Sequence, residues 1–215
     1  MNKKALVTWG GWDGHDPLQT SSLAREILEA EGFDVVFVNT MEVYTDAAFM
    51  ATLDLIVPVW TMSEITGDQS AALQNTIGAG CGLAGWHGGM CDSFRKDTNY
   101  QWMTGGQWVA HPGGIIPYHV TITKNDDPIV KGLADFDITS EQYYMHTDPG
   151  NDVLATTTFD GGHADWVKGC VMPVAWKRPW KKGRVFYTSL GHVRQDFEVP
   201  QVREMVRRGM LWAAR

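Results

Sequence analysis

The stretch GLAGWHGGM, residues 82–90, joins a short apolar run to a turn that reads Gly-Trp-His-Gly-Gly. Many α/β enzymes place a nucleophile at the apex of such a strand-to-helix turn. Here the apex residue is His87, and it precedes Gly88 and Gly89, whose missing side chains allow another group to approach closely. The stretch therefore predicts an α/β protein with a histidine at the position where a nucleophile is common.

Apolar runs upstream of this turn alternate with helical patterns. We predict strands at residues 4–9, 34–39, 54–59 and 82–86. Strands that alternate with helices indicate βαβ units and a mainly parallel, buried sheet. The first helix is predicted at 18–31, ending near Gly32, and another begins at the capping box Thr66-Gly-Asp-Gln69.

The pattern changes after the turn. Residues 100–125 are rich in Gly, Trp and Pro, which predicts an irregular middle insertion that ends in a strand at 117–123, antiparallel and at an edge. Later strands are predicted at 152–157, 171–176 and 184–188, and a final helix from about residue 199. The sequence contains no linker or repeat, so we expect one domain over residues 1–215.

Charge and cysteine content limit the partners and the compartment. The formal net charge is −7, and no run of Lys or Arg exceeds two residues, so neither nucleic acid nor an anionic membrane is an expected partner. Cys81, Cys91 and Cys170 match neither a disulfide framework nor a zinc finger. The apolar run near the N-terminus is too short for a signal peptide, and no stretch is long enough to span a membrane. We therefore expect a cytoplasmic protein that binds a neutral or cationic small molecule.

Three histidines follow predicted strands. His15 comes after the first strand, His87 after the fourth and His192 after the last. Ligands of open parallel sheets bind at the carboxyl ends of the strands, so we expect these histidines at one edge. Histidine near neutral pH serves as acid, base or metal ligand. Trp12 and Trp60 fall at the same edge, where an aromatic ring can stack on the C–H face of a sugar.

The segment ITSEQYYMHTDP, residues 138–149, supplies a carboxylate, Glu141, and Tyr143. A carboxylate there can pair with a histidine or bind a metal ion. A divalent metal such as Zn²⁺ takes ligands of the types found at His15, His87, Glu141 and His192, but these residues show no local motif of the His-x-x-x-His kind. Acid–base chemistry without a metal therefore stays open as well.

Five stretches along the chain, in order, resemble the ThuA-like (trehalose utilisation) family. They are the first-strand loop ending in His15, GWHGG, GGQWVAHP at 105–112, EQYY at 141–144 and VAWKRPWKKGRVFYTSLGH at 174–192. That family is similar in fold to the class I glutamine amidotransferases, so the resemblance implies a flavodoxin-like three-layer sandwich. Amidotransferases carry a cysteine where this chain has His87, so glutaminase activity is not expected.

The resemblance also implies a role with disaccharides such as trehalose, or with their 3-keto derivatives. It directs attention to His15, His87, Glu141 and His192 as catalytic residues. Candidate substrate-binding residues are Gly88, Gly89, Trp12, Trp60, His111 and Tyr143, with the amides of the two glycines holding a substrate oxygen.

We expect a carbohydrate-active lyase or hydrolase that uses His/Glu acid–base chemistry, with or without a metal. A non-catalytic sugar-binding module and a metal-dependent hydrolase of an amide or ester are the alternatives. The exposed edge strand and the Trp-rich middle segment favour a homo-oligomer.

Overall fold

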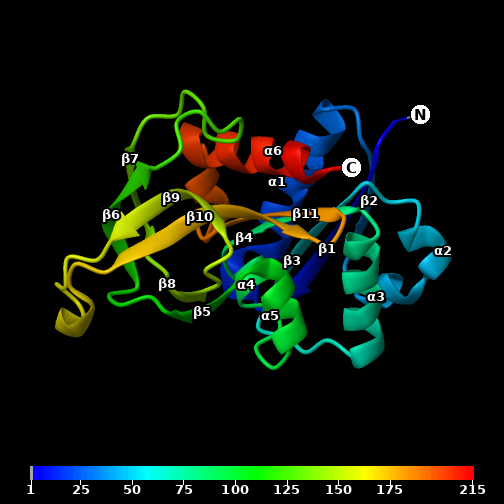
Figure 1. The fold of residues 1–215 in the computed structure, drawn as a ribbon, viewed down its shortest axis with the longest axis horizontal. Helices are drawn as coiled ribbons and strands as arrows, with labels where there is room; N and C mark the ends of the chain where they lie inside the picture. The colour runs from blue at the N-terminus through cyan, green and yellow to red at the C-terminus, as the bar shows by residue number, and fades with distance from the viewer. Residues whose placement is uncertain (1) are drawn as a thin grey trace.

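A nine-stranded sheet forms the centre of the protein in the computed structural model, which describes residues 2–215 (Figure 1). Its strand order is β2-β1-β3-β4-β11-β10-β9-β6-β7. The parallel half consists of β2 (Asp34–Val38), β1 (Lys4–Gly11), β3 (Leu55–Thr61), β4 (Gly82–Trp86) and β11 (Gly183–Thr188). This half has the 2-1-3-4-5 order of flavodoxin-like sheets. The predicted mixed α/β class is confirmed.

The other half of the sheet is antiparallel. It consists of β10 (Val171–Trp180), β9 (Asp152–Thr158), β6 (Ile115–Ile122) and β7 (Phe136–Glu141). The strand predicted at 117–123 is antiparallel, but it lies between β9 and β7 rather than at the edge. A two-residue turn at 181–182 joins β10 to β11, with Lys181 at φ 53°. Such a short connection requires an antiparallel pair.

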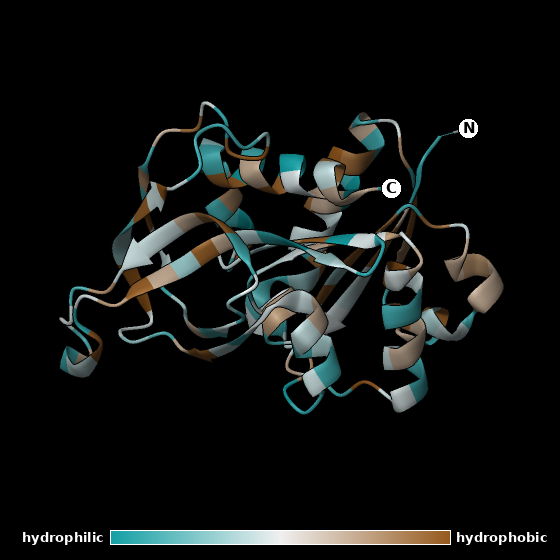
Figure 2. Cartoon of the chain, in the orientation of Figure 1, coloured by the Kyte–Doolittle hydropathy of each residue, from teal (hydrophilic) through white to brown (hydrophobic). Residues whose placement is uncertain are grey.

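Helices cover both faces of the sheet and make three layers (Figure 1). One face carries α1 (Pro17–Ala30) and α6 (Pro200–Ala213), and the other carries α2 (Ala47–Met50), α3 (Gly67–Gly78), α4 (His87–Cys91) and α5 (Thr98–Thr104). The strand residues alternate between the layers, since Val7 packs with the α1 and α6 side and Leu6 with the α3 side. Hydrophobic and hydrophilic residues alternate along α6 and α3 (Figure 2).

The helix boundaries agree with the sequence patterns. The capping box at α3 is formed as predicted, because Thr66 Oγ1 accepts from the amide of Gln69 at 3.2 Å and Gln69 Oε1 accepts from that of Thr66 at 3.1 Å. No helix in residues 2–215 is long and apolar enough to cross a membrane.

The middle segment contains more regular structure than the sequence predicts. After α5, strand β5 (Gly106–Ala110) pairs antiparallel with β8 (Tyr144–Thr147) in a second, two-stranded sheet. The glycines in this segment allow close packing, since a Cβ on Gly106 would lie 2.8 Å from the buried ring of Trp176. Four short 3-10 helices complete the fold: η1 (Asp13–His15), η2 (Glu42–Thr45), η3 (Asp165–Val167) and η4 (Arg194–Glu198).

Candidate functional site

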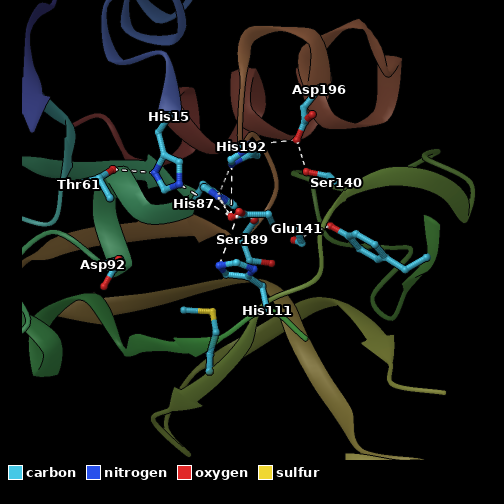
Figure 3. A network of polar contacts seen from close by, with 12 residues as sticks. His15, Thr61, His87, Asp92, His111, Ser140, Glu141, Ser189, His192 and Asp196 are labelled. Carbon is cyan, nitrogen blue, oxygen red and sulfur yellow. Dashed lines mark hydrogen bonds and ion pairs between the residues drawn. The ribbon is translucent and has the colours of Figure 1, made fainter. Parts of the chain in front are cut away.

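Four buried side chains that are far apart in the sequence meet at the carboxyl edge of the parallel strands (Figure 3). His15 ends η1 after β1, His87 begins α4 after β4, and His192 lies in the loop after β11. Glu141 is the last residue of β7, so it reaches the edge from the antiparallel half. One ligating atom of each side chain lies within 4.8 Å of those of the other three. We call these four residues the His₃Glu cluster.

Glu141 Oε2 is the centre of the cluster. It lies 3.0 Å from His87 Nε2, 3.4 Å from His192 Nδ1 and 3.9 Å from His15 Nε2. His87 Nε2 and His192 Nδ1 are 3.3 Å apart. Three ring nitrogens thus converge on one carboxylate oxygen.

Outer partners fix the orientation of two of the rings. His87 Nδ1 donates to the carbonyl oxygen of Ser189 at 2.8 Å, so the neutral ring carries its lone pair on Nε2, which points into the cluster, and only the protonated ring donates from Nε2 to Glu141. The hydrogen bond between His15 Nδ1 and Thr61 Oγ1, 3.0 Å, turns His15 Nε2 toward the cluster. Thr61 was not predicted from the sequence, because a threonine at the end of β3 is an ordinary strand-end residue.

The protonation states follow from burial and from the carboxylate. Burial, together with the neighbouring His87 and His192, lowers the pKa of His15 to about 2. Burial also lowers the pKa of His87, against the opposing hydrogen bond with Glu141. Burial by itself would raise the pKa of Glu141, but hydrogen bonds with His192 and His87 outweigh it and lower that pKa. Neutral imidazoles beside an ionised carboxylate are the forms that bind metal ions.

The pKa of His192 shifts in the opposite direction to those of His15 and His87. Burial by itself would lower the pKa of His192, but the hydrogen bond and the charge of Glu141 outweigh it and raise that pKa. His192 is therefore the imidazole of the cluster that most readily carries a proton when no cation is bound.

Backbone strain is concentrated around the cluster. His87 has φ 48°, which confirms a sharp turn at the apex of the quoted stretch. Asp16, directly after His15, has φ 47°, and Met62, directly after Thr61, has φ 49°. Non-glycine residues in this region are strained and persist where surrounding contacts hold them, often at functional sites.

The glycines after the apex allow close packing inside the protein. A Cβ on Gly88 would lie 2.6 Å from His15 Cε1, and a Cβ on Gly89 would lie 3.1 Å from Val59 Cα. Their missing side chains therefore let α4 approach His15 and β3. That their amides hold a substrate oxygen stays a prediction. Cys91 is buried, and burial raises the pKa of its thiol.

Three further candidates contact the cluster. Tyr143 stacks on His87 with ring centroids 4.0 Å apart, and Trp12 meets His15 edge-on at 4.8 Å. His111 Nε2 lies 3.7 Å from Glu141 Oε1, the oxygen that faces away from the other histidines. The side chain of His111 is 35% exposed and Trp12 is 47% exposed, so both can reach a ligand.

Trp60 has a different environment. Its ring packs over Gly10 at the end of β1, where a Cβ would lie 2.9 Å from the ring. Its buried Nε1 has no hydrogen-bond partner in the described part of the chain. The structure does not bring Trp60 into contact with the His₃Glu cluster, and a role in binding substrate stays a prediction.

Asp196, in η4, is a second residue that sequence reasoning missed. Its buried carboxylate accepts from Ser140 Oγ at 2.6 Å and from the amide of His192 at 2.9 Å. Because Ser140 directly precedes Glu141, Asp196 links the end of β7, which carries Glu141, to the loop after β11, which carries His192. An acidic residue four positions after His192 carries no signal of this role in the sequence.

Replacing Asp196 by alanine is expected to weaken Zn²⁺ binding about tenfold or more, because His192 and Glu141 lose their shared support. Zn²⁺ titration against a competing chelator measures the affinity. Asp137→Ala is the matched control, since Asp137 is exposed and pairs with His119 outside the cluster. Equal affinities of the two variants would show that Asp196 does not position the ligands.

The fold and the cluster together define the class: a doubly wound α/β protein with buried histidines and a glutamate at the carboxyl edge of its parallel strands. The chain belongs to the ThuA family, whose model is described as trehalose utilisation and matches residues 4–213. No curated protein matches the sequence.

Solved structures of similar fold include ThuA-like proteins. A putative ThuA-like protein from Bacteroides uniformis is 17% identical with a TM-score of 0.81, covering 98% of this chain and 91% of its own. One from Parabacteroides merdae is 20% identical with a TM-score of 0.79, covering 99% and 90%. A cytoplasmic protein from Salmonella typhimurium is 13% identical with a TM-score of 0.68, covering 99% and 100%. At these identities the likeness shows a shared fold.

Proposed function

We propose that this chain is a metal-dependent enzyme of carbohydrate metabolism that acts on a disaccharide or a 3-keto-glycoside. One observation carries the proposal: four buried ligating atoms of His15, His87, Glu141 and His192 lie within 4.8 Å of one another. The family description, trehalose utilisation, supports a carbohydrate as the substrate.

The chemistry of the donor set fits a divalent transition metal. Three imidazoles and one carboxylate suit Zn²⁺, Mn²⁺, Fe²⁺ or Ni²⁺, and the lone pair of His87 is already directed inward by its bond to Ser189. The four residues of the cluster would hold the ion. When bound, it would polarise a carbonyl or hydroxyl oxygen of the substrate.

Residues around the cluster would bind the sugar and move protons. Trp12, half-exposed beside His15, offers a ring face to the C–H face of a sugar. His111 is outside the His₃Glu cluster, is partly exposed and lies next to Glu141 Oε1. We therefore propose His111 as the group that transfers protons to or from the substrate. Tyr143, stacked on His87, keeps that ring in place.

The reaction we propose is an elimination on a 3-keto-glycoside. A base removes the proton at C2, next to the ketone, and the C–H electron pair forms a C1–C2 double bond. The bond between C1 and the glycosidic oxygen breaks, and that oxygen takes a proton to leave as an alcohol. No oxidant or reductant is needed.

Metal analysis and turnover test the proposal. We expect about one equivalent of a transition metal in the purified protein, and release of glucose from 3-keto-trehalose that stops on chelation and returns with Zn²⁺, Mn²⁺ or Ni²⁺. No turnover of 3-keto-trehalose or 3-keto-glucosides with any of these ions would overturn it. Stabilisation by the sugar without a product would instead identify a non-catalytic sugar-binding module.

The proposal extends to the organisation of the protein. We take residues 1–215 as one ThuA-like domain of the class I glutamine amidotransferase-like superfamily, and the strand order of the parallel half supports this assignment. The Salmonella protein of similar fold is named as cytoplasmic, which supports the same location here. A homo-oligomer is expected from the open edge of β7 and the exposed ring of Trp102. Light scattering on the purified protein measures its mass and tests this.

A further inference from the structure

An open groove of about 560 Å³ begins beside His192 and runs between β7 and η4. It is lined by Ile115, Ile138, Thr139, Ser140, His192, Val193, Gln195, Asp196, Glu198, Val199 and Pro200. Of these, only His192 belongs to the His₃Glu cluster. The groove is therefore a separate space that shares one wall with the candidate site.

The lining favours an uncharged apolar group. Five of the eleven lining residues are aliphatic, the exposed surface of the lining is mostly apolar, and Ile115 is 61% exposed although it is a large apolar residue. Among the described residues that line it there is no lysine or arginine, so an anionic group would find no counter-charge. One oxygen of Asp196, Oδ2, accepts from both Ser140 and His192, and the carboxylates of Asp196 and Glu198 both repel anions.

The same lining is poorly suited to a second sugar ring. Protein sites for sugars use an aromatic face against the C–H groups of the ring. Among the described residues of the groove there is no tryptophan, tyrosine or phenylalanine. The aromatic residues lie instead on the other side of the cluster, where Trp12 contacts His15 and Tyr143 contacts His87.

The groove adjoins the cluster. His192 belongs to the cluster and lines the groove, and two other lining residues are neighbours of Glu141: Ile115 is paired with it across the β6–β7 ladder, and Ser140 directly precedes it. The groove is therefore the space beside the cluster into which a molecule held at His192 would extend.

We infer that this groove binds the apolar aglycone, aryl or alkyl, of a glycoside whose sugar ring lies at the His₃Glu cluster. The inference rests on the proposed function, because it assigns a place to the leaving group of those 3-keto-glycosides in which that group is apolar rather than a second sugar. Ile115 and Val193 then determine specificity for the aglycone, while Trp12 and Tyr143 face the sugar.

The experiment compares phenyl and methyl glucosides, which lack the ketone and bind without reacting. Calorimetric titration of the Zn²⁺-loaded protein is expected to show about tenfold tighter binding of the phenyl glucoside, because the groove removes part of the ring from water. Ile115→Asp is expected to abolish this preference and to leave the affinity for methyl glucoside unchanged, and both titrations are made at saturating Zn²⁺ because the new carboxylate lies opposite Glu141. Val171→Asp is the control, since Val171 is 59% exposed on β10 and outside the groove.

Equal affinities for the two glucosides in the natural protein, or a phenyl preference that survives Ile115→Asp, would overturn the inference. Turnover of a methyl 3-keto-glucoside without any phenyl preference would overturn the groove alone and leave the proposed function standing. If neither glucoside binds, phenol is added alone: amide shifts at Ile115 and Val193 support an apolar subsite, and their absence overturns it. A dimer that Ile115→Asp splits in sedimentation would show that a second copy covers the groove, which also overturns it.

Discussion

Replacing His87 by alanine is expected to lower the affinity for Zn²⁺ by more than about 100-fold, because loss of a direct ligand exceeds the effect of losing an outer partner. His87 Nε2 is the ring nitrogen nearest to Glu141 Oε2, at 3.0 Å, and the ring is fully enclosed. Its removal also deprives Glu141 of one of the two hydrogen bonds that lower its pKa. Turnover of a 3-keto-glucoside is expected to fall to background. Chelator competition and product release measure the two effects.

His119→Ala provides the control for this variant. His119 is a histidine of β6, and its side chain is 56% exposed and pairs with Asp137 away from the cluster. Its loss is expected to leave Zn²⁺ affinity and turnover unchanged. Unfolding curves in excess chelator show whether His87→Ala still folds. A folded His87→Ala protein that keeps one tightly bound Zn²⁺ would remove His87 from the ligand set.

The position of the histidines was predictable from the sequence for a simple reason. Strand ends can be read from apolar runs, and all parallel strands of a sheet end at the same edge. His15, His87 and His192 follow such runs, so their meeting required no knowledge of distances. The parallel half of the fold was predictable in the same way, because apolar runs alternate with helical patterns up to the turn at His87.

The rest depends on contacts that have no local pattern. Glu141 ends an antiparallel edge strand, and its arrival at the cluster depends on the pairing of β6 with β7. The turn at 181–182 lacks the Asn-Gly or Asp-Gly residues that mark a hairpin, so the antiparallel half was not foreseen in full. Asp196 acts through hydrogen bonds to Ser140 on β7 and to His192, and Thr61 acts through one hydrogen bond to His15 in η1. Such partners are set by tertiary packing.

Strain and close packing around the cluster have a common origin. Positive φ values at Asp16, Met62 and His87 turn three loops sharply at the ends of β1, β3 and β4. His15 and His87, which lie beside these turns, have ring centroids 4.6 Å apart. Because strain of this kind costs of order 1–3 kcal/mol per residue, the surrounding packing must offset it. The glycines beside the cluster are part of that packing.

Gly88→Ala tests this relationship by adding one methyl group. The new Cβ would lie 2.6 Å from His15 Cε1 and 2.9 Å from Thr61 Cγ2, so either the imidazole or α4 must move. Thr61 holds the ring of His15 on one side, and Trp12 packs against it edge-on. We expect a loss of about 1–3 kcal/mol in the free energy of unfolding. We also expect a 10- to 100-fold loss of Zn²⁺ affinity, the usual effect of displacing a ligand without deleting it.

Gly67→Ala separates the effect of this contact from that of a glycine-to-alanine change in general. Gly67 is the first residue of α3, and a Cβ there would meet nothing within 4 Å. Its replacement is expected to leave Zn²⁺ affinity unchanged and stability unchanged or slightly higher, because alanine favours the helix. If Gly88→Ala binds Zn²⁺ as tightly as Gly67→Ala, His15 is not held as a ligand by the packing of α4. If it binds Zn²⁺ normally but no longer binds methyl glucoside, the amides at Gly88 and Gly89 meet the substrate instead.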